Sequence, residues 1–129
     1  MERQRLRTPL SQAIGLGSAK EGVAHWWSQR VSAVALVVLG LWFVAAIIAH
    51  AGADRAVVIE WLHGPLSAIL TILLVAAVFY HGALGLQVVI EDYIHSEWLK
   101  IPSLVVMRLL SLALAVAGIF AVLRIAFGG

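Results

Sequence analysis

The chain has 129 residues, of which 62% are hydrophobic and only 12% are charged, with a formal net charge of +2. Its mean hydropathy is +0.98. This small number of charged residues cannot cover the surface of a soluble domain of this size. The composition therefore excludes an ordinary soluble protein. The small positive excess does not indicate a nucleic-acid-binding surface. The chain has no cysteine, which excludes disulfides, thiolate metal sites and Fe–S ligation.

Residues 1–30 form a polar segment that contains Pro9 and several glycines and begins with Arg3, Arg5 and Arg7. We expect this segment to be irregular or short-helical and to lie outside the bilayer. An Arg-rich start is also typical of a transit peptide. Because a hydrophobic span follows closely, we interpret it instead as a retained topogenic signal of a bacterial protein.

Three long stretches lack Asp, Glu, Lys and Arg altogether: 31–53, 61–90 and 109–123. A helix needs roughly 20 residues to cross a hydrocarbon core about 30 Å thick, and each stretch meets or approaches that length. We therefore predict an all-α integral membrane domain over residues 31–129, with transmembrane helices at about 31–49, 66–90 and 104–127. Pro65 and Pro102 would each occupy a first helical turn, where proline is tolerated.

The connections between the predicted spans, at about 51–64 and 91–102, are short, so consecutive spans must alternate in an up-down-up topology. Five Lys or Arg residues lie in the first 30 residues, and Lys100 and Arg108 lie in or near the second connection. The first connection contains one such residue, Arg55. The positive-inside rule therefore places the N-terminus and the second connection in the cytoplasm. Aromatic residues at the predicted span ends fit an interfacial belt: Trp26, Trp27, Trp61, Tyr93 and Trp98.

His81 lies inside the second predicted span, about nine residues, or roughly 13 Å of rise, from its cytoplasmic end. An imidazole at that depth needs a partner, which makes a functional role the first hypothesis. One ring nitrogen can ligate haem iron while the other donates a hydrogen bond. Gly82 and Gly85 would leave room for a flat macrocycle. The alternative is a histidine that hydrogen-bonds a neighbouring helix, and by residue type alone this is the commoner role.

Asp92 and Tyr93 follow at the cytoplasmic end of the same span. If the helix continues that far, Asp92 lies within about 20° of the direction of His81, because eleven residues complete almost whole turns. A tyrosine hydroxyl at a membrane interface can donate a hydrogen bond to a quinone carbonyl, and a carboxylate can relay protons. The alternative is an interfacial anchor beside a residue that ends the helix.

The remaining polar residues allow two interpretations each. Arg30 could bind an anion such as a haem propionate, or snorkel as a topology-determining charge. Gln87 would hydrogen-bond another helix or the backbone, and Arg108 and Arg124 would snorkel from the third span. The other histidines lie at or beyond the interfaces, where they are more often surface groups than ligands: His25, His50, His63 and His95.

Three parts of the sequence together resemble the small hydrophobic membrane anchor subunit of succinate dehydrogenase, respiratory complex II, a cytochrome b-type anchor. They are Gly15-Leu-Gly-Ser-Ala-Lys-Glu-Gly22, then His25-Trp-Trp-Ser-Gln-Arg30 with Ser32-Ala33, and His81-Gly with Asp92-Tyr93-Ile94-His95. The resemblance covers almost the whole chain. Its specific part is the spacing of His81 from the Asp-Tyr pair, because many membrane proteins share the hydrophobic pattern.

The resemblance implies a set of partners and sites. A second, larger cytochrome b-type anchor subunit would share a haem b with this chain, with His81 as one axial ligand and Arg30 near the propionates. Tyr93 would hydrogen-bond ubiquinone, with Asp92 beside it. An Fe–S subunit and a flavoprotein subunit would dock on the cytoplasmic face of the bacterial inner membrane, and the chain alone would not be catalytic. The competing hypothesis is a small helical transporter or assembly subunit, which the absence of broken helices disfavours.

Overall fold

The computed structural model describes residue 10 and residues 19–128. Within 19–128 the chain forms four helices and no strand: α2 (Ala19–Ala49), α3 (Arg55–His63), α4 (Pro65–Tyr93) and α5 (Glu97–Gly128). Three of these helices, α2, α4 and α5, are long and apolar enough to cross a membrane. The predictions of an all-α fold and of three spans are therefore confirmed.

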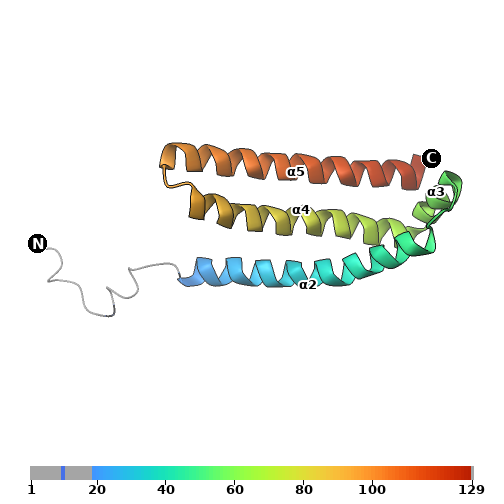
Figure 1. The fold of residues 1–129 in the computed structure, drawn as a ribbon, viewed down its shortest axis with the longest axis horizontal. Coiled ribbons are helices and arrows are strands. Elements are labelled where there is room, and N and C mark those ends of the chain that lie inside the picture. The colour runs from blue at the N-terminus through green and yellow to red at the C-terminus, as the bar shows by residue number, and fades with distance from the viewer. Residues whose placement is uncertain (1–9, 11–18, 129) are drawn as a thin grey trace, which may run out of the picture.

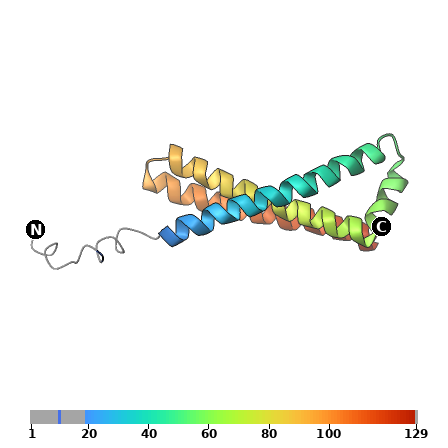
Figure 2. The same cartoon turned by 90° about the horizontal axis from the view of Figure 1, so that it is seen from below.

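The helix α4 lies between the other two long helices (Figure 1) and packs against both, while α2 and α5 do not pack against each other among the described residues. Consecutive long helices run in opposite directions (Figure 1). Seen from the side, α2 crosses the α4–α5 pair at an angle (Figure 2). One end of the bundle therefore holds the start of α2 together with the turn between α4 and α5. The other end holds α3 and the C-terminus.

All three long helices extend beyond the predicted spans. With 31, 29 and 32 residues they are each roughly 45 Å long, whereas the hydrocarbon core is about 30 Å thick. The difference is largest in α2, which begins at Ala19, twelve residues before the predicted span start at Val31. A helical backbone satisfies its own hydrogen bonds in lipid and in the interface alike, so helices do not stop where the hydrocarbon ends.

The two prolines differ in their positions. Pro65 is the first residue of α4, as predicted, so its missing N–H removes no intrahelical bond. Pro102, by contrast, lies inside α5, which already begins at Glu97. The prediction of a first-turn position for Pro102 was therefore wrong. The Trp98 carbonyl, four residues earlier, loses the helical hydrogen bond that residue 102 would otherwise donate.

The first connection contains a helix that was not predicted. After α2 the chain turns at Gly52, whose φ of +80° is a conformation that suits glycine. Asp54 then precedes α3, a nine-residue helix. Trp61 of α3 stacks on Trp42 of α2 with ring centroids 5.8 Å apart, and it also lies 5.1 Å from the His50 ring. This aromatic cluster holds α3 against the end of α2.

The bundle buries very little of its own surface. Among the described residues no large side chain is fully enclosed, and those that count as buried are small or flexible: Ser32, Ala68, Thr71, Met107 and Val122. Many large apolar side chains point outward. This is the pattern of helices surrounded by lipid and partner helices, because hydrocarbon solvates a leucine as well as a protein interior does.

Gly118 allows α5 to approach α4 closely. A Cβ atom at this position would lie 3.0 Å from Val75 Cγ1. We predict that Gly118→Val weakens the α4–α5 contact by about 1–3 kcal/mol through overpacking. The measurement is the apparent melting temperature of the purified complex in detergent. A second change, Val75→Ala, should recover part of the loss in the Gly118→Val background. If it lowers the melting temperature further, as in the wild type, the proposed clash is refuted.

Candidate functional site

His81 of α4 contacts Ser32 of α2 across the interface between these two helices. Its Nδ1 atom lies 2.9 Å from the Ser32 Oγ atom. The same Ser32 hydroxyl lies 2.7 Å from the Ser28 carbonyl oxygen and 3.1 Å from the Gln29 carbonyl oxygen, one turn earlier in α2. The His81 side chain is therefore not free to rotate in lipid but is held by a neighbouring helix.

The number of protons decides the direction of the Ser32–His81 hydrogen bond. A serine hydroxyl has one proton, and the carbonyls of Ser28 and Gln29 can only accept. Because two oxygens only 2.7 Å apart need a proton between them, we assign the proton to the Ser28 carbonyl, so that the Ser32 oxygen accepts from His81 Nδ1–H. In a neutral imidazole this leaves the lone pair on Nε2. No described residue hydrogen-bonds this nitrogen, so it remains available as a metal ligand.

The Ser32–His81 contact also fixes the relative depth of α2 and α4. His81 lies twelve residues before the end of α4 and Ser32 thirteen residues after the start of α2, both close to 18–20 Å of rise. The predicted spans had put Ser32 in the first turn of span one and His81 nine residues deep in span two. The two predicted boundaries, at Val31 and Ile90, therefore do not lie level with each other in the bundle. Beside the first of them, the Arg30 guanidinium stacks 5.5 Å from the Trp26 ring centroid.

The α4 surface next to His81 is uncovered in this chain. A Cβ atom added at Gly82 or Gly85 would meet nothing within 4 Å. These glycines are therefore not required for packing against α2 or α5. A histidine with a free nitrogen beside a bare glycine surface fits the requirements of a haem held between two subunits, because a flat macrocycle needs close access to the helix backbone.

The other predicted site residues lie apart from His81. The helix α4 continues to Tyr93, so the condition for His81 and Asp92 to share one stripe is met. They are separated by about 16 Å along the axis. Asp92 and Tyr93 are both exposed, Tyr93 at 80%. Arg30 is exposed and lies about 200° around α2 from Ser32, so the structure does not bring it to the His81 ring.

A polar chain links α5 to α4 between His81 and the helix end. Arg108 Nη2 donates to Gln87 Oε1 at 2.9 Å, and Gln87 Nε2 donates to Glu91 Oε1, also at 2.9 Å. Gln87 thus hydrogen-bonds another helix, as predicted. Arg108, which is expected to snorkel to the interface, also has a defined partner in Gln87. The amide connects a cation and an anion that do not touch each other.

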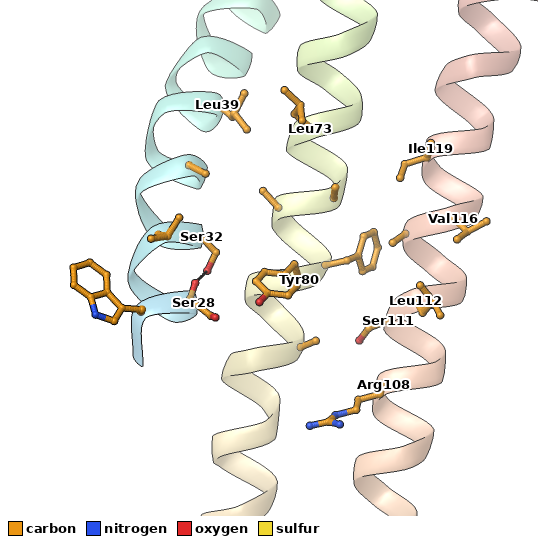
Figure 3. A pocket seen from close by; sticks show the side chains of 18 residues that line it. Ser28, Ser32, Leu39, Leu73, Tyr80, Arg108, Ser111, Leu112, Val116 and Ile119 are labelled. Carbon is orange, nitrogen blue, oxygen red and sulfur yellow. Dashed lines mark hydrogen bonds between the residues drawn. The ribbon is translucent and has the colours of Figure 1, made fainter. Parts of the chain in front are cut away.

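An apolar groove of about 1000 Å³ lies where α2 and α5 flank α4 (Figure 3). Its polar lining residues gather toward the end where α2 begins, among them Ser28, Tyr80, Arg108 and Ser111 (Figure 3). His81 does not line it. Gly82 lies about 200° from Tyr80 around α4, so the groove and the glycine surface occupy opposite faces. Hydrocarbon or another helix suits the groove, which adjoins the His81 site through Ser32 but includes neither His81 nor the two glycines.

Comparison with known proteins identifies the family. A family model described as "Succinate dehydrogenase/Fumarate reductase transmembrane subunit" matches residues 4–125. The chain belongs to this family. A succinate dehydrogenase hydrophobic membrane anchor subunit from Rickettsia bellii is 37% identical over 116 residues, which cover 90% of this chain and 93% of the relative. The protein of the same name from Paracoccus denitrificans is 32% identical over 121 residues, 94% of this chain and 93% of the relative.

The succinate dehydrogenase anchor contains polar groups that the sequence analysis did not single out. Ser32 appeared there only as part of a motif and not as the partner of His81. The signal was present, because a histidine deep in a span requires an acceptor on a neighbouring helix. Two further atoms, His25 Nε2 and Gln29 Oε1, are enclosed and have no partner among the described residues. Both precede Ser32 on the same side of α2, so this surface is more polar than its hydropathy indicates.

The helix register predicts a specific crosslink. Because the chain has no cysteine, introduced pairs are the only thiols it contains. We expect Ser32→Cys with His81→Cys to form an intrachain disulfide upon mild oxidation. Ser32→Cys with Gly82→Cys should form far less, because residue 82 is rotated about 100° from residue 81. Counting free thiols by the mass shift with a maleimide polymer measures both variants. Equal oxidation of the two pairs would contradict the register.

Proposed function

We propose that this succinate dehydrogenase anchor provides His81 as one axial ligand to a haem b, which it shares with a second, larger cytochrome b-type anchor subunit. The observation that carries the proposal is the 2.9 Å contact of His81 Nδ1 with Ser32, which leaves Nε2 as the ligating nitrogen. The bare surface at Gly82 and Gly85 supports it, because the macrocycle and the partner subunit need that space. When bound, the haem supplies a one-electron redox centre within the membrane.

Arg30 is proposed to neutralise a haem propionate. It lies two residues from Ser32, or about 3 Å along the α2 axis, so it is nearly level with His81. A guanidinium at that depth is costly in hydrocarbon unless an anion accompanies it. Its stacking on Trp26 shields one face of the cation and leaves its N–H donors at the edge for a carboxylate.

Tyr93 and Asp92 are proposed to form this chain's part of a ubiquinone-reducing site. Reduction of a quinone to a quinol takes up electrons and protons in equal numbers, which requires contact with water as well as an apolar wall. The end of α4 offers both, because Tyr93 is exposed at the last helical residue and Asp92 lies beside it. The tyrosine hydroxyl would donate to a quinone carbonyl, and the carboxylate would pass protons toward it.

The proposed ubiquinone site requires further subunits and a defined orientation of the bundle in the membrane. We infer that an Fe–S subunit delivers electrons from a flavoprotein subunit to the quinone at the end of the bundle where α4 meets α5. Lys100 lies at this end, and the Arg-rich segment precedes α2 in the sequence, so the positive-inside rule supports a cytoplasmic location for this end. The N-terminus would then be cytoplasmic, the spans up-down-up, and the host membrane the bacterial inner membrane.

The haem assignment predicts a visible spectrum. We expect a reduced-minus-oxidised b-type signal from the purified wild-type complex. The signal should be lost or strongly reduced in His81→Ala. It should persist in His50→Ala, because His50 bonds the Ala46 carbonyl at the opposite end of α2. A wild-type complex without a b-type signal would refute the haem assignment but not the anchor role.

The quinone assignment predicts a selective kinetic effect. Tyr93→Phe removes one hydroxyl and one hydrogen bond of about 1 kcal/mol, so ubiquinone reduction should slow roughly fivefold. Succinate oxidation with an artificial soluble dye should be unchanged. The chain has one other tyrosine, Tyr80, which lies in the groove, so Tyr80→Phe is the matched control. If Tyr93→Phe behaves like Tyr80→Phe in both assays, Tyr93 has no role at the quinone.

A further inference from the structure

Two polar residues are buried among the described part of the chain, Ser32 at 7% exposure and Thr71 at 8%. The Thr71 hydroxyl donates to the Ser67 carbonyl at 2.7 Å and thus finds its partner within its own helix. The Ser32 hydroxyl makes the same type of bond to Ser28, but its oxygen also contacts His81 on α4. Burial and the backbone bond are therefore common to both residues, and Ser32 differs by a second, longer contact to the Gln29 carbonyl and by its contact with the imidazole on another helix.

The contact with Ser32 determines which nitrogen of His81 can bind a metal. The two neutral tautomers of an imidazole are close in energy when nothing else contacts the ring, and the environment selects between them. The Ser32 proton is directed to the Ser28 and Gln29 carbonyls, so the oxygen offers only a lone pair to His81. The tautomer with the proton on Nδ1 is thereby stabilised. In the alternative tautomer the serine proton would have to turn to the Nδ1 lone pair, and the bonds to the Ser28 and Gln29 carbonyls would be lost.

We propose that Ser32 is a positioning residue for haem ligation, whose hydroxyl oxygen accepts Nδ1–H of His81 and thereby fixes both the ring orientation and Nε2 as the iron-binding nitrogen. The proposal rests on the proposed role of His81 as an axial ligand. It assigns to α2 a part in the haem site that does not require contact with the haem.

The electronic consequence has a definite sign. An acceptor on the N–H of a ligating histidine increases the electron density at the other nitrogen and strengthens its bond to the metal. Greater donation favours the oxidised iron over the reduced iron. Removal of the Ser32 oxygen should therefore shift the haem reduction potential in the positive direction. It should also weaken haem retention, because loss of a partner of this kind typically costs 10–100-fold in affinity.

The test uses the intact membrane complex with three variants. Ser32→Ala removes the acceptor, Ser32→Thr keeps a hydroxyl at the same position, and Thr71→Val removes a buried, backbone-bonded hydroxyl that does not contact His81. The readouts are the haem content per complex, the midpoint of an optical redox titration, and the low-spin electron paramagnetic resonance signal. The amount of assembled complex in the membrane is measured for each variant.

The expected result is that Ser32→Ala loses haem about tenfold more readily, with a more positive midpoint and an altered low-spin signal. Ser32→Thr and Thr71→Val should remain near wild type. If Ser32→Ala fails to assemble, the proposal still requires that Ser32→Thr assembles with a wild-type midpoint, and a shifted midpoint in Ser32→Thr would overturn it. Haem properties in Ser32→Ala equal to those in Thr71→Val would overturn the role of Ser32 but leave His81 as a ligand. Absence of b-type haem from the wild-type complex would overturn both.

Discussion

Hydrocarbon provides no hydrogen-bond partner, and this constraint determines the rest of the structure. Each backbone amide must be satisfied within its helix, so long helices are the only spans the chain can form. Each polar side chain at depth must find a partner across a helix interface or on its own helix. His81 finds Ser32, Thr71 finds the Ser67 carbonyl, and Gln87 joins Arg108 to Glu91. Each of these contacts ties a polar residue to a defined position in the bundle, and two of them tie helices together.

The sequence predicted the number and nature of the spans because hydropathy measures the preference for hydrocarbon directly. It was less informative about where helices begin and end. Pro102 seemed to mark a helix start, yet α5 begins at Glu97, because local turn formation at the interface is not encoded in hydropathy. The helix α3 was missed for a similar reason. Its Asp54-Arg55 start is a recognisable helix signal, but the stretch is short and its main stabilising contact, Trp61 on Trp42, is tertiary.

For the candidate site, the sequence identified the residue that needs a partner but not the partner itself. His81 could be singled out because the free-energy cost of an imidazole inside the membrane depends on the position of that residue in its own span. Ser32 could not, because its significance depends on how α2 crosses α4 and on how far the two helices are shifted along their axes, and hydropathy encodes neither. The exposed positions of Asp92 and Tyr93 were predictable, since both follow the last apolar residues of the span.

The scarcity of buried side chains has a consequence for the biosynthesis of the protein. Within the described residues the bundle encloses a handful of small or flexible side chains, so it has little interior of its own. In lipid, an exposed apolar surface costs nothing, and a solitary copy can insert without difficulty. Under the proposed haem role, that copy would differ from an assembled one at the second ring nitrogen of His81, which has no partner among the described residues, and at the open surface of Gly82 and Gly85. The helices can therefore enter the membrane before any other subunit is present, and later assembly depends on a few polar and glycine positions rather than on a shared hydrophobic core.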